Sequence, residues 1–159
     1  MISFDQGNQR FNFRVVGVAI HNDKVLLHQA DGDSFWSLPG GRVEFGEAAE
    51  ETLRREMREE LDVEIEVVRL LWLVENFFVY DGKNYHELSP YFLMRLPESS
   101  PYLTEPGPYK CAETGSNLIF RWFPNTPETL AKLPVLPAFL QVELQTLPET
   151  TRHIVHRDE

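Results

Sequence analysis

The chain has 159 residues and a formal net charge of −10, a length typical of one domain. The negative charge disfavours stable binding of nucleic acid or of an anionic membrane surface, because long-range electrostatic steering would repel both. The single cysteine, Cys111, excludes an intrachain disulfide and a thiolate metal site, and it is typical of a reducing, cytoplasmic compartment. The first residues lack the basic and apolar regions of a secretory signal. No apolar run approaches the ~20 residues that span a bilayer.

The first half of the chain predicts short strands around one strong helix. β-branched and apolar residues on both sides of Asn22-Asp23 indicate a hairpin. Helix formers dominate after Gly46, and acids near the start of that segment suit the positive end of a helix dipole. The expected elements are a hairpin over 13–21 and 24–30, a short strand over 35–41 that ends in the turn Pro39-Gly40-Gly41, a second short strand over 42–45, and a helix over 47–61.

The second half begins with a long hairpin and then becomes rich in proline. Asp81-Gly82 is a strong hairpin turn between two apolar, aromatic segments. A long segment without predicted structure is often a binding loop or lid. The expected elements are strands over 63–80 and 85–96, a loop over 97–116, a last strand over 118–123, a C-terminal helix over 134–147 whose apolar stripe is Leu136, Phe139, Leu140, Leu144 and Leu147, and a less ordered tail from Pro148.

Residues 41–63 are the most informative segment, because they contain seven Glu and four Arg. Three of the acids, Glu56, Glu59 and Glu60, have the i, i+3, i+4 spacing that places side chains on one face of a helix. At about 100° per residue this acidic stripe lies next to the apolar stripe of the same helix and not opposite to it. Clustered carboxylates beside a glycine turn suit a divalent cation bound to a phosphate chain. A salt-bridged surface helix, with Arg55 and its neighbours neutralising the acids, is the equally open alternative.

The spacing around these acids resembles the signature of the Nudix hydrolase family, G-x5-E-x7-R-E-U-x-E-E-x-G-U, in which U is a bulky apolar residue. One position departs, because Asp62 stands where the family has glycine. We expect a left-handed backbone there, which Asp tolerates at a cost of about 1 kcal/mol. The resemblance covers most of residues 11–147 and implies an α/β (α+β) fold, an α/β/α sandwich around a mixed β-sheet, in a single domain over residues 1–159. The matching positions are Gly41, Glu47, Arg55, Glu56, Met57, Glu59, Glu60 and Val63.

The resemblance also implies a reaction. Nudix hydrolases cleave a nucleoside diphosphate linked to another group, by attack of water on phosphorus with the help of Mg2+ or Mn2+. Glu56, Glu59 and Glu60 would be the metal ligands, with the Gly40 carbonyl as a further one. By the same resemblance, Glu56 and Glu59 are also candidates for the catalytic base.

Some members of the family take the catalytic base from a later loop. Glu87, Glu105 and Glu113 are candidates for it, and Glu113 is favoured because it stands just before the last expected strand. An alternative on the same fold is a nucleotide-binding sensor without catalysis. Such proteins usually lose signature acids, which this chain keeps. The residues expected to support the site structurally are Gly41, Glu47 and Arg55.

The substrate is expected to be a nucleotide-type small molecule, and its exact class stays open. Arg14 and Arg42 are candidate phosphate contacts, and Trp36 and Tyr80 are candidates to stack on a base. The position that carries a proline in ADP-ribose hydrolases is Phe78 here, whereas Tyr80 matches a tyrosine of some dinucleoside polyphosphate hydrolases. Nucleoside triphosphates, dinucleoside polyphosphates and nucleotide sugars all remain candidates. The family contains both monomers and homodimers.

Overall fold

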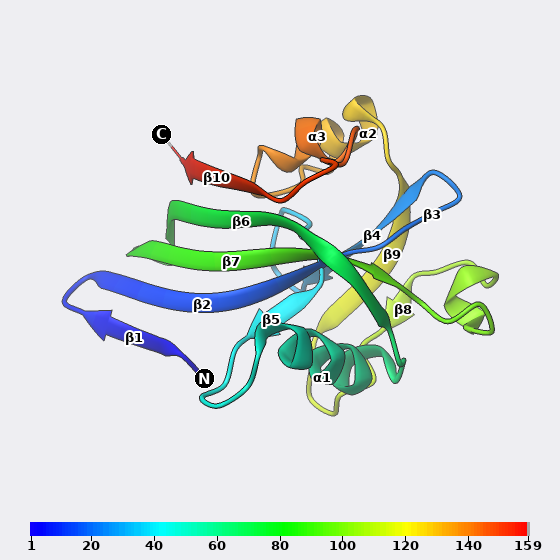
Figure 1. Cartoon of the computed structure of the whole chain (residues 1–159), viewed down its shortest axis with the longest axis horizontal. Coiled ribbons are helices and arrows are strands. Elements are labelled where there is room, and N and C mark those ends of the chain that lie inside the picture. Colours follow the sequence, from blue (N-terminus) through cyan, green and yellow to red (C-terminus); the bar gives the residue numbers. More distant parts are fainter. Residues whose placement is uncertain (159) are drawn as a thin grey trace.

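The computed structural model describes residues 1–158, which form two β-sheets and a few helices (Figure 1). None of the helices in this part of the chain is long and apolar enough to cross a bilayer. The larger sheet contains β1 (Ser3–Gln6), β2 (Gln9–Val18), β5 (Gly40–Arg42), β6 (Glu66–Tyr80), β7 (Lys83–Arg95) and β10 (Arg152–Arg157). The smaller sheet contains β3 (Ile20–His21), β4 (Lys24–Ala30), β8 (Tyr109–Lys110) and β9 (Leu118–Pro124). The helices are α1 (Ala49–Leu61), α2 (Pro127–Lys132) and α3 (Leu140–Glu143), with a 3-10 turn η1 (Pro101–Leu103).

The larger sheet is mixed. Its strand order is β1-β2-β7-β6-β10, and β5 pairs with β2 beside this path. β2 runs parallel to β7, and β10 runs parallel to β6, while the other pairs in this sheet are antiparallel. The smaller sheet has the order β3-β4-β9-β8. The predicted mixed α+β class is therefore confirmed.

Two separate hydrophobic clusters cover the two sides of the strands, because successive strand residues point to opposite faces. Val15 belongs to the cluster that contains Leu53 and Met57 of α1, whereas Val16 belongs to the cluster that contains Leu130 of α2 and Leu140 of α3. Figure 1 shows α1 on one side of the larger sheet and α2 and α3 on the other. This layering is the sandwich that the resemblance implied.

α1 begins and ends close to the predicted positions. The helix starts at Ala49, two residues later than expected. The Glu51 side chain accepts a hydrogen bond at 2.8 Å from the backbone N–H of Ala48, the residue before the helix. At the other end, Asp62 adopts the left-handed backbone with φ 52° and ψ 46°, as predicted. Its N–H donates to the carbonyl of Arg58, which closes the last turn.

The predicted helix over 134–147 is wrong. The structure has only the single turn of α3 there, preceded by turns around Pro134 and Pro137. Proline has no N–H for the helical ladder and clashes with the preceding turn, so two prolines in this window prevent a continuous helix. The apolar residues of the predicted stripe are nevertheless buried or partly buried, because Leu140 and Leu144 pack into the cluster beside α2.

The prediction of a less ordered tail after Pro148 is also wrong. Residues 152–157 form β10, which pairs in parallel with β6 along its whole length. At the other end of the chain, β1 and the first residues of β2 form a hairpin that the sequence pattern did not indicate. The expected hairpin over 13–21 and 24–30 is reduced to the short β3–β4 pair, since β2 pairs with β7 and stays in the larger sheet.

Candidate functional site

The three glutamates of α1 lie at different depths between helix and sheet. Glu60 is buried, with 5% of its surface exposed. The side chain of Glu56 is 15% exposed and that of Glu59 is 42% exposed. A merely solvated, salt-bridged face would leave all three acids in water, so the burial of Glu60 and Glu56 favours a built site.

The glycine turn brings the backbone of β5 directly against α1 and β2. Gly40 pairs with Val16 and Gly41 pairs with Val15 in an antiparallel ladder. A Cβ atom added to Gly41 would lie 2.6 Å from Oε1 of Glu56, and one added to Gly40 would overlap the carbonyl oxygen of Val15. Because neither position has room for a side chain, the two glycines set how closely the Glu56 carboxylate approaches the strand.

Arg55 connects the acids to one another. Its guanidinium donates to both carboxylate oxygens of Glu47, at 2.8 and 3.1 Å, and to Glu56 at 3.0 Å. It also donates to Glu59 at 3.3 Å and to the backbone carbonyl of Arg42. The hydrogen bond from Arg55 lowers the pKa of Glu47 to about 2. Arg55 therefore connects Glu47 before α1, Glu59 on α1 and the backbone of β5 through hydrogen bonds.

The carboxyl groups of Glu56 and Glu60 lie close enough for each to shift the pKa of the other. Burial, followed by the neighbouring charge of Glu56, raises the pKa of Glu60 to about 9. Burial also raises the pKa of Glu56. Oε2 of Glu60 is buried without a hydrogen-bond partner. A buried, unpartnered carboxyl oxygen beside a second carboxyl group is an arrangement that a cation would stabilise, since it would satisfy the oxygen and favour ionisation of both acids.

The loop before β9 lies against the end of α1. The N–H of Ala112 donates to the backbone carbonyl of Glu60 at 2.6 Å, and the charge of Glu113 contributes to the raised pKa of Glu60. Glu113 is therefore close to the α1 carboxylates. Of the other two candidates for the base, Glu105 belongs to the turn whose backbone carbonyl accepts from Tyr109, and Glu87 lies on β7 in a different part of the site.

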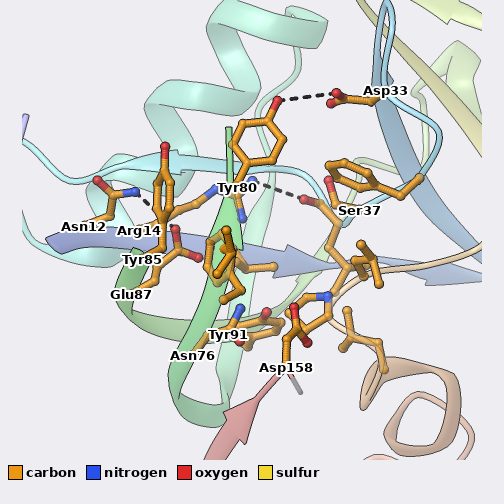
Figure 2. Close-up of a pocket in the computed structure, with 18 of the residues that line it drawn as sticks. Asn12, Arg14, Asp33, Ser37, Asn76, Tyr80, Tyr85, Glu87, Tyr91 and Asp158 are labelled. Carbon is orange, nitrogen blue, oxygen red and sulfur yellow. Dashed lines mark hydrogen bonds between the residues drawn. The ribbon is translucent and has the colours of Figure 1, made fainter. Parts of the chain in front are cut away.

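A cavity of about 320 Å³ lies over one face of β2, β7 and β6, on the side of the sheet that carries α3 (Figure 2). Arg14, Arg42 and Tyr80 are among the residues that line it. Arg14 is the register partner of Arg42 across β2 and β5. The positive charge of Arg14 lowers the pKa of Glu60 and so partly offsets the effect of burial. Arg14 thus links the cavity to the acidic cluster. Tyr80 is half-exposed at the rim, where its hydroxyl donates to Asp33 at 3.4 Å.

Trp36 is the one candidate contact that the cavity does not include. Its ring packs edge-on against Phe123 with a centroid distance of 4.7 Å. Its backbone N–H donates to the carbonyl of Pro134. The neighbouring residues Phe35 and Ser37 line the cavity instead. The structure gives the Trp36 side chain a packing role between the smaller sheet and the segment after α2.

The match to a known family model assigns the chain to a protein family. The model of the NUDIX domain matches residues 12–132, which is most of the chain and contains α1, both glycines and the larger part of the cavity. The chain belongs to the Nudix family.

Individual relatives agree with this Nudix assignment over shorter segments. The "Putative mutator protein MutT4" of Mycobacterium tuberculosis (strain CDC 1551 / Oshkosh) is 41% identical over 74 residues, which cover 45% of this chain and 30% of that protein. The RNA pyrophosphohydrolase of Ruthia magnifica subsp. Calyptogena magnifica is 37% identical over 73 residues, which cover 45% of this chain and 41% of that protein. The chain therefore spans less than half the length of these two relatives.

The fold is also similar to solved Nudix structures. A crystal structure of a NUDIX hydrolase from Nitrosomonas europaea superposes with a TM-score of 0.57 at 17% identity, covering 91% of this chain and 78% of that one. At this identity the similarity concerns the fold alone.

Nudix hydrolases generally use divalent metal ions, and the residues of this Nudix site fit such an ion. The donors are carboxylate oxygens, the ligands that hard cations prefer, and Oε2 of Glu60 has no partner in the protein. Within residues 1–158, no three acidic, histidine or cysteine side chains converge on one point, and Glu56 and Glu59 both accept hydrogen bonds from Arg55.

Several polar residues of the cavity were not among the residues predicted from the sequence. Asn12, Asn76 and Asp158 line it, together with Glu87, which the sequence suggested only as a possible base. They come from β2, β6, β7 and the end of β10, so no local spacing connects them. Only the register of the sheet brings them together.

Proposed function

We propose that this Nudix protein is a hydrolase that uses Mg2+ or Mn2+ to cleave the pyrophosphate bond of a nucleoside diphosphate linked to another group. A nucleoside triphosphate, a dinucleoside polyphosphate and a nucleotide sugar all fit this description. The observation that carries the proposal is the buried carboxyl group of Glu60, whose Oε2 has no hydrogen-bond partner and which lies close to Glu56. A pyrophosphohydrolase among the relatives supports the reaction class.

Further parts of the proposal concern the whole chain. Residues 1–159 would act as one Nudix domain, which is supported by two hydrophobic clusters that share the same strands. The lone Cys111 supports a cytoplasmic location. The acidic net charge of −10 supports small nucleotides, rather than nucleic acid or a membrane, as binding partners.

Each residue of the site has a role in this proposal. Glu56, Glu59 and Glu60 would hold the cation, with the Gly40 carbonyl as a further ligand. A bound cation would neutralise charge on phosphate oxygens and lower the pKa of the attacking water. Glu113 would accept the proton of that water, because the residue before it, Ala112, donates a hydrogen bond to the backbone carbonyl of Glu60. Glu59 is the other candidate for this base, since it is the most exposed of the three α1 acids.

The surrounding residues would position these groups and the substrate. Arg55 holds Glu56 through a hydrogen bond of 3.0 Å and Glu47 through two. Glu47 in turn accepts from the hydroxyl of Thr52. Arg14 and Arg42 line the cavity, where they would bind phosphate oxygens, and the backbone carbonyl of Arg42 accepts a hydrogen bond from Arg55 of α1.

A panel of nucleotides with Mg2+ or Mn2+ tests the proposal through the release of phosphate or pyrophosphate. We expect turnover of at least one substrate by the wild type and a loss of about 10²-fold or more in kcat for Glu59→Gln and for Glu60→Gln. Glu64→Gln is a matched control, because Glu64 follows the same helix but its side chain is exposed and pairs with Arg58. Tight nucleotide binding without turnover of any substrate would instead indicate a sensor and would overturn the proposal.

A further inference from the structure

A row of polar side chains crosses the larger sheet at the floor of the cavity. Asn12 on β2 is the register partner of Glu87 on β7, and Glu87 is the register partner of Asn76 on β6. The row continues to Ser3 on β1 and to His156 on β10. Register partners of adjacent strands point to the same face, so these side chains lie together. Figure 2 shows Asn12, Glu87 and Asn76 near one another on the cavity side.

Hydrogen bonds within the row leave Glu87 as an acceptor for a ligand. The hydroxyl of Ser3 donates to Oδ1 of Asn12 at 2.5 Å, which directs the Asn12 amide N–H toward Oε2 of Glu87 at 3.4 Å. The hydroxyl of Ser89 lies 3.4 Å from Oε1 of Glu87. Both contacts are long, and each carboxylate oxygen accepts more than one hydrogen bond. Asn12 is therefore occupied by the protein, whereas Glu87 retains accepting capacity on the cavity side.

Asn76 supplies a second acceptor. Only 5% of the Asn76 surface is exposed, although the residue lines the cavity. The side-chain oxygen Oδ1 of Asn76 has no hydrogen-bond partner. Buried amide oxygens without partners are rare in native proteins and indicate a missing donor. Asp158 adds a carboxylate to the same wall, where its backbone N–H donates to Phe77 and its side chain contacts His156 at 3.0 Å.

Aromatic rings and arginines flank the polar row on opposite sides. Tyr85 and Phe78, the next register pair on the same face of β7 and β6, are stacked with centroids 4.9 Å apart and planes inclined by 15°. Arg14 lies two residues beyond Asn12 on β2 and is the register partner of Arg42, whose backbone carbonyl accepts a hydrogen bond from Arg55 of α1. A nucleotide with its phosphates at Arg14 would therefore place its base on the polar row and beside the aromatic pair.

We propose that Glu87, assisted by Asn76, selects a nucleobase whose edge carries two adjacent N–H donors, as guanine does at N1 and its 2-amino group. An ionised carboxylate can only accept hydrogen bonds, and it pairs best with two parallel donors. Adenine, cytosine and uracil place at least one acceptor on the corresponding edge. That acceptor would face a carboxylate oxygen of Glu87 without a hydrogen bond, and Oδ1 of Asn76 would remain without a donor. This inference rests on the proposed function, because it concerns the base of the same substrate.

Part of the cavity wall lies outside the segment that the NUDIX domain model matches. Leu136, Leu140 and Asp158 line the cavity but lie outside residues 12–132, the segment that the NUDIX domain model matches. The segment after α2 and the residue after β10 thus complete the wall of the cavity, whereas α1 carries the acidic cluster. Base selection is therefore expected to depend on residues that the family signature does not contain.

Comparison of guanosine and inosine triphosphates tests the selection, because inosine lacks only the 2-amino group. We expect the wild type to prefer the guanosine compound by about tenfold or more in kcat/KM, the discrimination typical of one bidentate contact. In Glu87→Gln this ratio should fall close to one, mainly through KM, while the melting temperature stays near that of the wild type. Glu66→Gln, an exposed acid at the far start of β6, is the matched control and should retain the preference.

The outcomes separate this inference from the proposed function. Equal turnover of all bases by the wild type would overturn base selection and leave the hydrolase proposal standing. An equal loss of kcat for every base in Glu87→Gln would show a direct catalytic role for Glu87 and would also overturn it. If no nucleotide is turned over, calorimetric titration with both triphosphates decides the matter. Tighter binding of the guanosine compound that disappears in Glu87→Gln supports selection, and equal binding refutes it. If Glu87→Gln does not fold, Asn76→Ser is measured in the same way and should narrow the ratio.

Discussion

Replacing each glycine of the β5 turn by alanine should separate function from stability. A Cβ on Gly41 would lie 2.5 Å from Cγ and 2.6 Å from Oε1 of Glu56, but these atoms belong to a flexible side chain that can rotate away. The backbone of Gly41 is not left-handed, so alanine adds no backbone strain. We expect Gly41→Ala to displace the Glu56 carboxylate by at least an ångström and to lower kcat/KM about 10²-fold, the effect typical of such misplacement.

Gly40→Ala meets a different neighbour. Its Cβ would overlap the carbonyl oxygen of Val15 and lie 3.1 Å from Cα of Val16, and both belong to the backbone of β2. Relief therefore requires β5 to move away from β2, at a cost of about 1–3 kcal/mol that is typical of overpacking. For a domain of this size the melting temperature should fall by about 3–9 °C.

Thermal unfolding and nucleotide hydrolysis of the two variants, measured in parallel, test this reasoning. Gly41→Ala should melt within about 2 °C of the wild type, since alanine also lowers the entropy of the unfolded chain, and it should be nearly inactive. Titration with Mn2+ should show weaker binding to Gly41→Ala. The reasoning fails if Gly41→Ala retains wild-type activity, or if it is destabilised as strongly as Gly40→Ala.

Three further variants test the network around α1. Asp62→Gly should raise the free energy of unfolding by about 1 kcal/mol, because glycine adopts the left-handed backbone without cost, and a clear loss of activity would show a role for the Asp62 side chain. Arg55→Lys should lower activity by at least tenfold, because lysine cannot donate to both oxygens of Glu47 while also reaching Glu56, and unchanged kinetics would contradict this. The pKa of Glu47 is lowered by Arg55 to about 2, so its ionised form stabilises the fold above about pH 4.5 and that contribution is lost as the pH falls toward 2. The difference in melting temperature between wild type and Glu47→Gln should therefore be larger at pH 7 than at pH 3, and a difference that does not depend on pH would argue against the ion pair.

Local patterns predicted the acidic part of the site. The helical period alone placed Glu56, Glu59 and Glu60 beside the apolar stripe, and Glu60 is indeed buried at that boundary. The departure at Asp62 was interpreted as a left-handed residue, and the backbone has that conformation. These predictions succeeded because each depends on residues within a few turns of one helix, where the spacing along the chain determines the spacing in space.

Longer-range features were predicted poorly. β10 pairs in parallel with β6, and Arg152 of β10 is the register partner of Trp72, 80 residues earlier in the chain. The short sequence of β10 contains no turn signal that could have indicated this pairing. The segment over 134–147 has a helical apolar pattern, but Pro134 and Pro137 convert it into turns, and burial against α2 then orients Leu140 and Leu144. Packing against distant strands determined both segments.

The sequence by itself determined the family, the helix that carries the acids and the glycine turn that faces it, because these residues lie within one continuous segment. Only the tertiary structure decided which side chains form the floor of the cavity. Asn12, Glu87 and Asn76 are adjacent solely through the register of three strands, and register depends on the side chains that the whole sheet buries. The proposed metal ligands are therefore local in the sequence, whereas the residues proposed to select the base come together only in the assembled sheet.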